Sequence, residues 1–273
     1  MHLSTIRRGM AIVALCATAA MGLTACRSGD GKPAADPSST RSAGGDGTAT
    51  PDPSSSKAAA PAPPQSALAQ LPASEIVRRA TRAMTAVHSL TADAKGSADG
   101  KPLAFDVAIN TRNECTGHIS EGRATAKLIS TGTHVYLAGD DAFLRQMGGA
   151  PMVRLLHGKW MKAAATSSGG KDLAGICDLK NLLSGFQEKP HKPRKGAPTT
   201  VDGKQAIPVT DSDPKDGSTS TAYIAADGTP YVLKVVTVGG TGPGTVVFSG
   251  FDAPVHVGTL PADRIVDIDT LGS

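Results

Sequence analysis

The sequence lacks the short motifs by which many enzyme families are recognised. It has no Gly-x-Ser-x-Gly elbow, no His-Glu-x-x-His pair, no Walker-type phosphate loop and no Cys-x-x-Cys pair. The aspartates at 140–141 and 211–216 suit turns and do not form the full ligand ladder of a calcium loop. Histidines beyond residue 25 are spread singly, which favours surface or strand positions over metal ligands or bases: His88, His118, His134, His157, His191 and His256. We therefore expect no enzyme, no metal and no cofactor.

A large excess of charge of either sign is also missing. The formal net charge is +4, and the first 25 residues hold two arginines and no acidic residue, which leaves about +2 for the rest. A nucleic-acid-binding protein would show a concentrated basic face, so no nucleic-acid partner is expected. The one basic run, residues 188–195, has two interpretations. It contacts anionic phospholipid or teichoic acid, or it is a solvated loop stiffened by proline.

The apolar run from Met10 to Leu23 carries no charge and is too short to cross a bilayer, which takes about 20 apolar residues. Basic residues before it and small residues after it are typical of an export signal. Leu23-Thr24-Ala25-Cys26 resembles the bacterial lipobox, which predicts a leader over residues 1–25 and a lipid on the Cys26 sulfur. Arg7-Arg8 raises the twin-arginine route, but the flanking residues favour the general secretory route.

Residues 26–71 are rich in Gly, Ser, Ala, Pro, Thr and Asp and contain no aromatic residue. Such a segment cannot bury enough apolar surface to offset its ordering entropy, so we expect a disordered linker. A flexible chain of about 45 residues reaches roughly 35–40 Å. The sequence thus predicts a monomeric domain held by its lipid anchor at the extracytoplasmic face of the cell membrane.

Four cysteines are present, and the leader and the anchor account for Cys16 and Cys26. Cys115 and Cys177 remain, and an even pair in an exported protein predicts a disulfide. The alternative is two free buried thiols.

The folded domain is expected to cover residues 72–273 and to begin with an amphipathic helix of about four turns that ends near His88. Ser74 suits the N-cap, and Glu75 favours the positive end of the helix dipole. Apolar residues recur at helical spacing with arginines on the opposite face: Ile76, Ala80, Ala83, Met84 and Val87 against Arg78, Arg79 and Arg82.

Strands dominate the rest of the domain. Residues 103–109 alternate between apolar and polar, and further strands follow at intervals of roughly ten residues. A second set begins with a hairpin turned at Asp202-Gly203, and 255–257 is expected to be a late strand. Between the two sets, residues 173–186 predict a second amphipathic helix, which carries Cys177. This order favours an α+β domain with antiparallel meanders.

The segments His134-Val135-Tyr136-Leu137 and Gly158-Lys159-Trp160-Met161 look like paired strands of a "VYL…GKW" type, and 248–261 looks like the closing segment of the same family. On these residues the chain resembles the mycobacterial LppX/LprG family of LolA-like lipoprotein carriers. The resemblance implies a strongly curved antiparallel sheet, or half-barrel, with helices on its concave side and an apolar cavity between them. It also implies a protein that binds a lipid and carries it across the envelope.

The apolar faces of the two helices have two interpretations that periodicity does not separate. They line a ligand cavity, or they fill the core. The candidate lining residues are Ile76, Ala80, Met84, Val87, Leu179, Leu182, Leu183 and Phe186. The first interpretation predicts an anchored carrier of a lipid or another apolar ligand. The second predicts a non-catalytic module with a filled core that acts through protein–protein contacts or as a sensor.

Overall fold

The computed structural model describes residues 66–98, 100–187 and 190–271 of the 273-residue chain. The predicted leader, the anchor site at Cys26 and nearly all of the linker lie outside these residues and stay predictions. The described part belongs to one folded unit, whose main apolar core draws on residues from Leu68 to Ile268. Among its helices, none is both long enough and apolar enough to cross a membrane.

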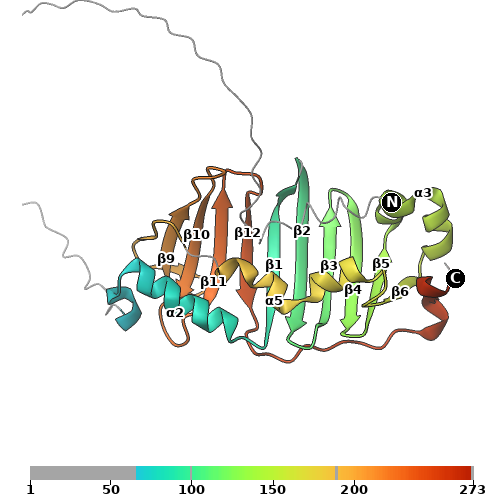
Figure 1. Cartoon of the computed structure of the whole chain (residues 1–273), viewed down its shortest axis with the longest axis horizontal. Helices are drawn as coiled ribbons and strands as arrows, with labels where there is room; N and C mark the ends of the chain where they lie inside the picture. Colours follow the sequence, from blue (N-terminus) through green and yellow to red (C-terminus); the bar gives the residue numbers. More distant parts are fainter. Residues whose placement is uncertain (1–65, 99, 188–189, 272–273) are drawn as a thin grey trace, which may run out of the picture. The chain divides into compact units, whose positions relative to one another are not determined.

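Thirteen strands of the described part form one sheet (Figure 1). Strands β1 to β6 follow one another across one half, β9 to β12 do so across the other, and β1 pairs with β12 to join the halves. The strand pairs are antiparallel, except for β13 with β6. The bounds are β1 (Ser89–Ala98), β2 (Lys101–Asn110), β3 (Glu114–Glu121), β4 (Ala124–Thr131), β5 (His134–Gly139), β6 (Trp160–Ala164), β7 (Arg194–Lys195), β8 (Thr199–Val201), β9 (Lys204–Ser212), β10 (Thr219–Ala225), β11 (Val232–Val238), β12 (Gly244–Ser249) and β13 (Ile265–Asp267).

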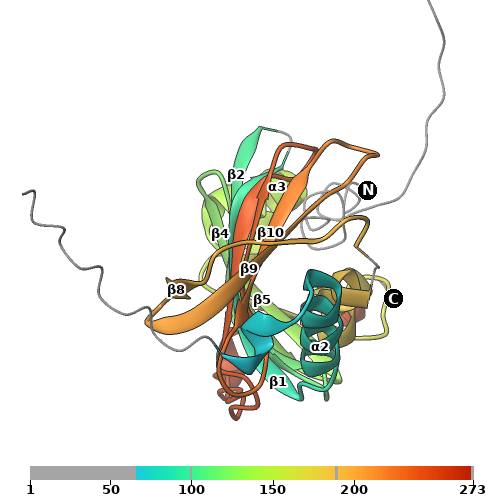
Figure 2. The same cartoon turned by 90° about the vertical axis from the view of Figure 1, so that its left-hand side faces the viewer.

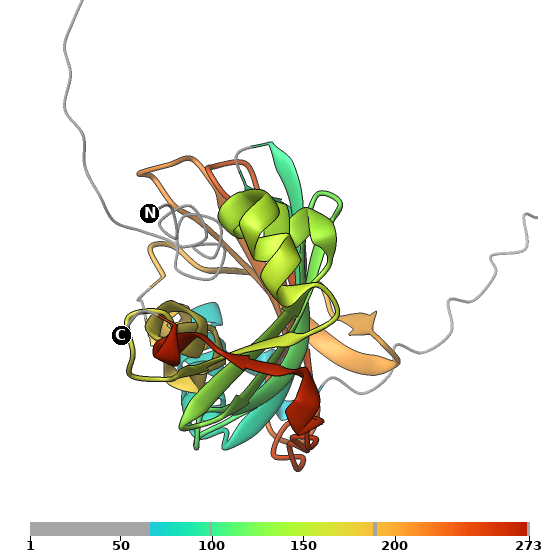
Figure 3. The same ribbon diagram turned by 90° about the vertical axis from the view of Figure 1, so that its right-hand side faces the viewer.

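The sheet curves, and its concave face carries helices (Figures 2 and 3). Alternation along the strands sets this face: in β4 Ala124, Ala126 and Leu128 are buried, whereas Thr125 and Lys127 are exposed. The helical elements are η2 (Ala67–Gln70), α2 (Ala73–Thr85), α3 (Asp141–Leu156), α4 (Lys171–Ala174), η3 (Gly175–Cys177), α5 (Leu179–Leu182), η4 (Ser184–Gln187), η5 (Ala262–Arg264) and η6 (Ile268–Thr270). The predicted α+β class, a strongly curved antiparallel sheet with helices on its concave side, is confirmed.

Helix α2 is the predicted amphipathic helix. Ile76, Ala80 and Met84 are buried on one face, and the helix ends at Thr85 because the chain must turn into β1. The expected N-cap was wrong: Pro72 takes that position, Ser74 lies within the helix, and no side chain caps the first turn.

The folded domain includes residues before the expected boundary at residue 72. Leu68 and Ala69 of η2 are buried in the core, although the sequence placed them in the linker. The Lys195 ammonium donates to the carbonyls of Ala69 (2.6 Å) and Leu71 (3.0 Å), which ties this segment to the edge of the sheet. Two apolar side chains are enough to bring a short stretch of an otherwise polar segment into the fold.

The second long helix expected over residues 173–186 is not formed. Four short elements, α4, η3, α5 and η4, follow one another instead, and we call residues 171–187 the short-turn segment. The break falls at Asp178, whose backbone is extended (φ −100°, ψ 105°) and whose carboxylate accepts from the amides of Lys180 (2.9 Å) and Asn181 (3.2 Å). Asp178 therefore ends one turn and caps the next. Its side chain hydrogen-bonds to nearby backbone amides, and this gives the chain an alternative to a continuous helix.

The hairpin predicted at Asp202-Gly203 joins β8 to β9. Both residues have positive φ (47° and 78°), as a type I′ turn requires. The strand expected at 255–257 is not formed: residues 253–261 carry no regular structure. Asp252, with φ 58°, holds the start of this stretch by accepting from the His88 amide (2.8 Å) and the Tyr231 hydroxyl (3.0 Å). The segment then leads to β13 at the far edge of the sheet.

Candidate functional site

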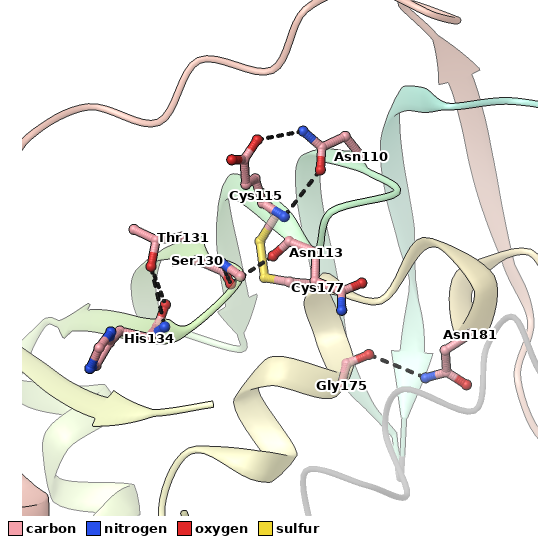
Figure 4. Close-up of a disulfide and its surroundings, with 11 residues drawn as sticks. Asn110, Asn113, Cys115, Ser130, Thr131, His134, Gly175, Cys177 and Asn181 are labelled. Atoms are coloured by element: carbon pink, nitrogen blue, oxygen red, sulfur yellow. Dashed lines mark hydrogen bonds between the residues drawn. A yellow bond between two sulfur atoms is a disulfide. The ribbon is translucent and has the colours of Figure 1, made fainter. Parts of the chain in front are cut away.

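A disulfide joins Cys115 on β3 to Cys177 in the short-turn segment, as the sequence predicted (Figure 4). Their Cα atoms are 5.5 Å apart, and neither residue has exposed surface. Hydrogen bonds hold the turn before Cys115: Asn110 Oδ1 accepts from the amides of Arg112 (2.9 Å) and Glu114 (3.2 Å). The bond fixes the middle of the short-turn segment to the concave face.

The eight candidate cavity residues come together beneath α2 and the short-turn segment. All eight belong to, or pack against, one apolar cluster. Ile76 and Met84 have no exposed surface, so neither side chain borders a space that holds water. Leu182 and Phe186 are partly exposed, and the Phe186 ring contacts Phe248 of β12 edge-on, with centroids 5.6 Å apart.

Burial differs along the concave face of β1 to β4. In the row nearest the disulfide, Leu90, Ile109 and Cys115 are at most 1% exposed. Two rungs away, Phe105 pairs with Ile119, and both are only partly buried. The sequence identified Phe105 as one residue of an alternating strand but did not single out either residue as a lining residue. Apolar surface therefore remains open on the concave side.

A groove of about 730 Å³ lies between α2 and the β10–β11 turn. Residues 66–68, Glu75 and three arginines line one side, and residues 226–228 with Pro230 line the other; we call it the arginine groove. Arg78 Nε (2.7 Å) and Arg79 Nε (2.8 Å) both donate to the Glu75 carboxylate. Hydrogen bonds from Arg79 and Arg78 lower the pKa of Glu75, so the carboxylate is ionised at neutral pH.

A smaller groove of about 340 Å³ lies on the face opposite the helices. Ile129 and Tyr136 of the sheet and Leu260 of the C-terminal segment are among its lining residues. Its walls are mainly apolar, and Glu114 is one of its lining residues. None of the eight candidate residues lines either groove.

Within the described residues, no group of three or more His, Cys, Asp or Glu side chains could hold a metal ion. The histidines stand apart from one another, several of them beside a carboxylate on the surface. His118 lies 3.3 Å from Asp106, and His157 lies 2.7 Å from Asp141. The described part of the basic run is held at two places: the amides of residues 191 and 192 donate to Asp211, and Arg194–Lys195 pair with β9 as strand β7. Positions 188–189 lie outside the described residues.

No protein-family model matches the sequence, and no curated protein sequence matches it. Solved structures do match. The lipoprotein LppX of Mycobacterium tuberculosis is 17% identical, with a TM-score of 0.45 over 67% of this chain and 97% of that chain. LprF from Mycobacterium bovis is 15% identical, with a TM-score of 0.48 over 68% and 96%. The structures that this chain is similar to thus include a member of the lipoprotein family whose motifs its sequence resembles.

Proposed function

We propose that the chain is a lipid-anchored protein of the extracytoplasmic face of the cell membrane that binds an acyl lipid between its sheet and its short-turn segment. The protein carries or presents this lipid and does not transform it. One observation carries the proposal: the cover of the concave face consists of short helical elements interrupted at Asp178, with open apolar surface at Phe105 and Ile119 beside it.

The short-turn segment is suited to move. A bound lipid needs a concave, mostly apolar space, since ligand sites in proteins have volumes of about 300–1,000 Å³. In this conformation the side chains beneath the cover are packed together, so a lipid enters by lifting the turns on either side of Cys177. The disulfide keeps the segment attached while its ends separate from the sheet. Elements with short, interrupted helices open at low free energy compared with a continuous helix.

The anchor supplies the location. A lipid on Cys26 and a linker place the domain within reach of the membrane surface, where acyl lipids are available. A single acyl chain binds a bilayer only marginally, whereas several chains hold firmly. The substitution Cys26→Ser should release the protein from the membrane, and its retention there would refute the anchor.

Mass spectrometry of protein extracted from membranes tests the lipid. Native spectra should show an acyl species that leaves on denaturation, in addition to the covalent mass on the Cys26 peptide. Loss of the covalent mass in the Cys26→Ser variant separates the anchor from the bound lipid. Protein without any releasable acyl species, under conditions that preserve the fold, would contradict the proposal.

A second function, a non-catalytic interaction or sensor module, is favoured by a different observation. Ile76 and Met84 have no exposed surface, as residues of a filled core would. This function predicts that no lipid is released and that adding lipid leaves the exchange of buried amides unchanged. The same spectra therefore decide between the two functions.

A further inference from the structure

The arginine groove lies outside the apolar site of the proposed function and has a chemistry of its own. Arg82 lies one helical turn after Arg78 and Arg79 on the solvent face of α2, opposite the buried face. At about 730 Å³, the groove is within the size range of small-molecule sites. Three cations along one wall favour an anionic ligand.

Two of the arginines are held in position before any ligand arrives. Glu75 accepts from Arg78 and from Arg79, and these bonds use only part of each guanidinium. A guanidinium has five N–H donors in a fixed fork that matches phosphate or carboxylate oxygens. Within residues 66–98, 100–187 and 190–271, the Arg82 guanidinium donates no hydrogen bond and forms no ion pair, although the Arg82 carbonyl accepts from the Ala86 amide (3.2 Å). The three guanidinium groups therefore have N–H donors left for a ligand, and Glu75 already holds two of these groups in position.

The rest of the groove is not basic. Leu68 lines it and also belongs to the apolar core, and Pro230 lies on the opposite side. Asp227 stands at the β10–β11 turn, where its carboxylate can accept hydrogen bonds from hydroxyl groups. These neighbours suit an amphiphile whose anionic headgroup also carries hydroxyls. A multiply charged anion is less suited, because Glu75 and Asp227 reduce the net charge of the groove to about +1.

We propose that the arginine groove binds the anionic, hydroxyl-bearing headgroup of a lipid, with phosphatidylglycerol as the representative chemistry. The inference rests on the proposed function and deepens it, because it names the class of lipid and the place of its headgroup. Arg79 and Arg82 bind the phosphate, Glu75 orients Arg79, and Asp227 accepts from the glycerol hydroxyls.

The test uses the mature chain without its anchor, residues 27–273, since the core lies wholly within the described unit. Binding is measured by sedimentation with vesicles of phosphatidylcholine, with and without phosphatidylglycerol. The variant R79Q/R82Q should bind the anionic vesicles roughly tenfold more weakly, as expected for lost hydrogen bonds between charged groups. The control R123Q/R154Q removes the same charge from exposed positions elsewhere and should bind like the unmodified chain.

Three outcomes would overturn the proposal. They are equal binding to both kinds of vesicle, equal weakening by both double variants, and unchanged binding by R79Q/R82Q with an intact melting curve. If the chain binds glycerol 3-phosphate but does not bind vesicles that contain phosphatidylglycerol, the groove binds a soluble anion. This result would overturn the lipid ligand. If any of these results is found while native spectra still show released acyl lipid, only the arginine-groove proposal fails and the proposed function stands. Failure of the one can therefore be told from failure of the other.

Discussion

Helix α2 and the short-turn segment cover neighbouring parts of one concave face by different means. Helix α2 is a continuous helix of 13 residues with apolar side chains on one face and arginines on the other, and no disulfide holds it. The short-turn segment has four elements of three or four residues, broken at Asp178, and a disulfide joins it to β3. The two covers meet where the Thr81 hydroxyl donates to the carbonyl of Phe186 (3.2 Å).

The difference shows what holds each cover. Burial of a regular apolar face is the main stabilisation of α2, since isolated helices of this length are marginal in water. One-turn helices gain little from their own hydrogen bonds, so the short-turn segment depends on the disulfide and on a few apolar side chains. In the proposed function, the covalently attached cover is the one that opens, and the helix without a covalent link is the one that stays.

The largest effect is expected from removing the disulfide. The double variant C115A/C177A should lower the free energy of unfolding by about 4 kcal/mol, the chain-entropy estimate for a loop of 62 residues. Chemical denaturation measures this, with the reduced unmodified chain as the second sample. A loss well below 1 kcal/mol would show that the short-turn segment is held by packing, as α2 is.

Met84→Ala on α2 should cost about 3 kcal/mol, because a side chain without exposed surface leaves a cavity behind. Leu182→Ala is the matched change in the short-turn segment, where the side chain is partly exposed. It should cost about 1 kcal/mol, since less apolar surface is lost from burial. If chemical denaturation shows the same loss in free energy of unfolding for both variants, the two covers do not differ in how their side chains are packed.

Asp178→Ala should destabilise the short-turn segment by about 1 kcal/mol, the usual cost of a lost N-cap. Asp178→Asn, which still accepts from the following amides, is the control and should stay within a few tenths of the unmodified chain. Thermal unfolding of both variants gives the comparison. If the two variants lose the same stability, the cap does not determine where the helix breaks.

The smallest effect concerns Glu75 and depends on pH. Hydrogen bonds from Arg79 and Arg78 hold its pKa below the ordinary value. These hydrogen bonds therefore stabilise the folded state above the ordinary pKa of glutamate, and this stabilisation is lost as pH falls through the lowered pKa. Glu75→Gln should lower the Tm slightly at pH 7, and this difference should disappear once the pH falls below the lowered pKa. Glu121→Gln, which loses a single lysine contact of 3.5 Å, is the control.

Local patterns in the sequence predicted much of the fold. Helix α2 follows from apolar spacing, the β8–β9 hairpin from Asp202-Gly203, and the disulfide from cysteine parity. The helix and the hairpin depend on residues that are close together in the sequence, and the disulfide depends on the number of cysteines. The break at Asp178 was missed because apolar residues recur on both sides of it, and periodicity does not reveal that a side chain caps the backbone instead.

The candidate sites depend on residues distant in the sequence, and this limits what could be predicted. The arginine groove joins α2 to the β10–β11 turn, whose Asp227 follows Arg79 by well over a hundred residues. The partial exposure of Phe105 and Ile119 depends on how far the short-turn segment reaches across the sheet. Alternation identifies the concave face of a strand but not which part of that face stays covered.

Hydrogen exchange of the lipid-loaded and delipidated protein tests the central claim most directly. With lipid bound, the amides of residues 171–187 should change in protection more than those of α2, because the acyl part of the lipid lies under the short-turn segment. No change over 171–187, or a change confined to residues 73–85, would contradict the claim that this segment covers the lipid.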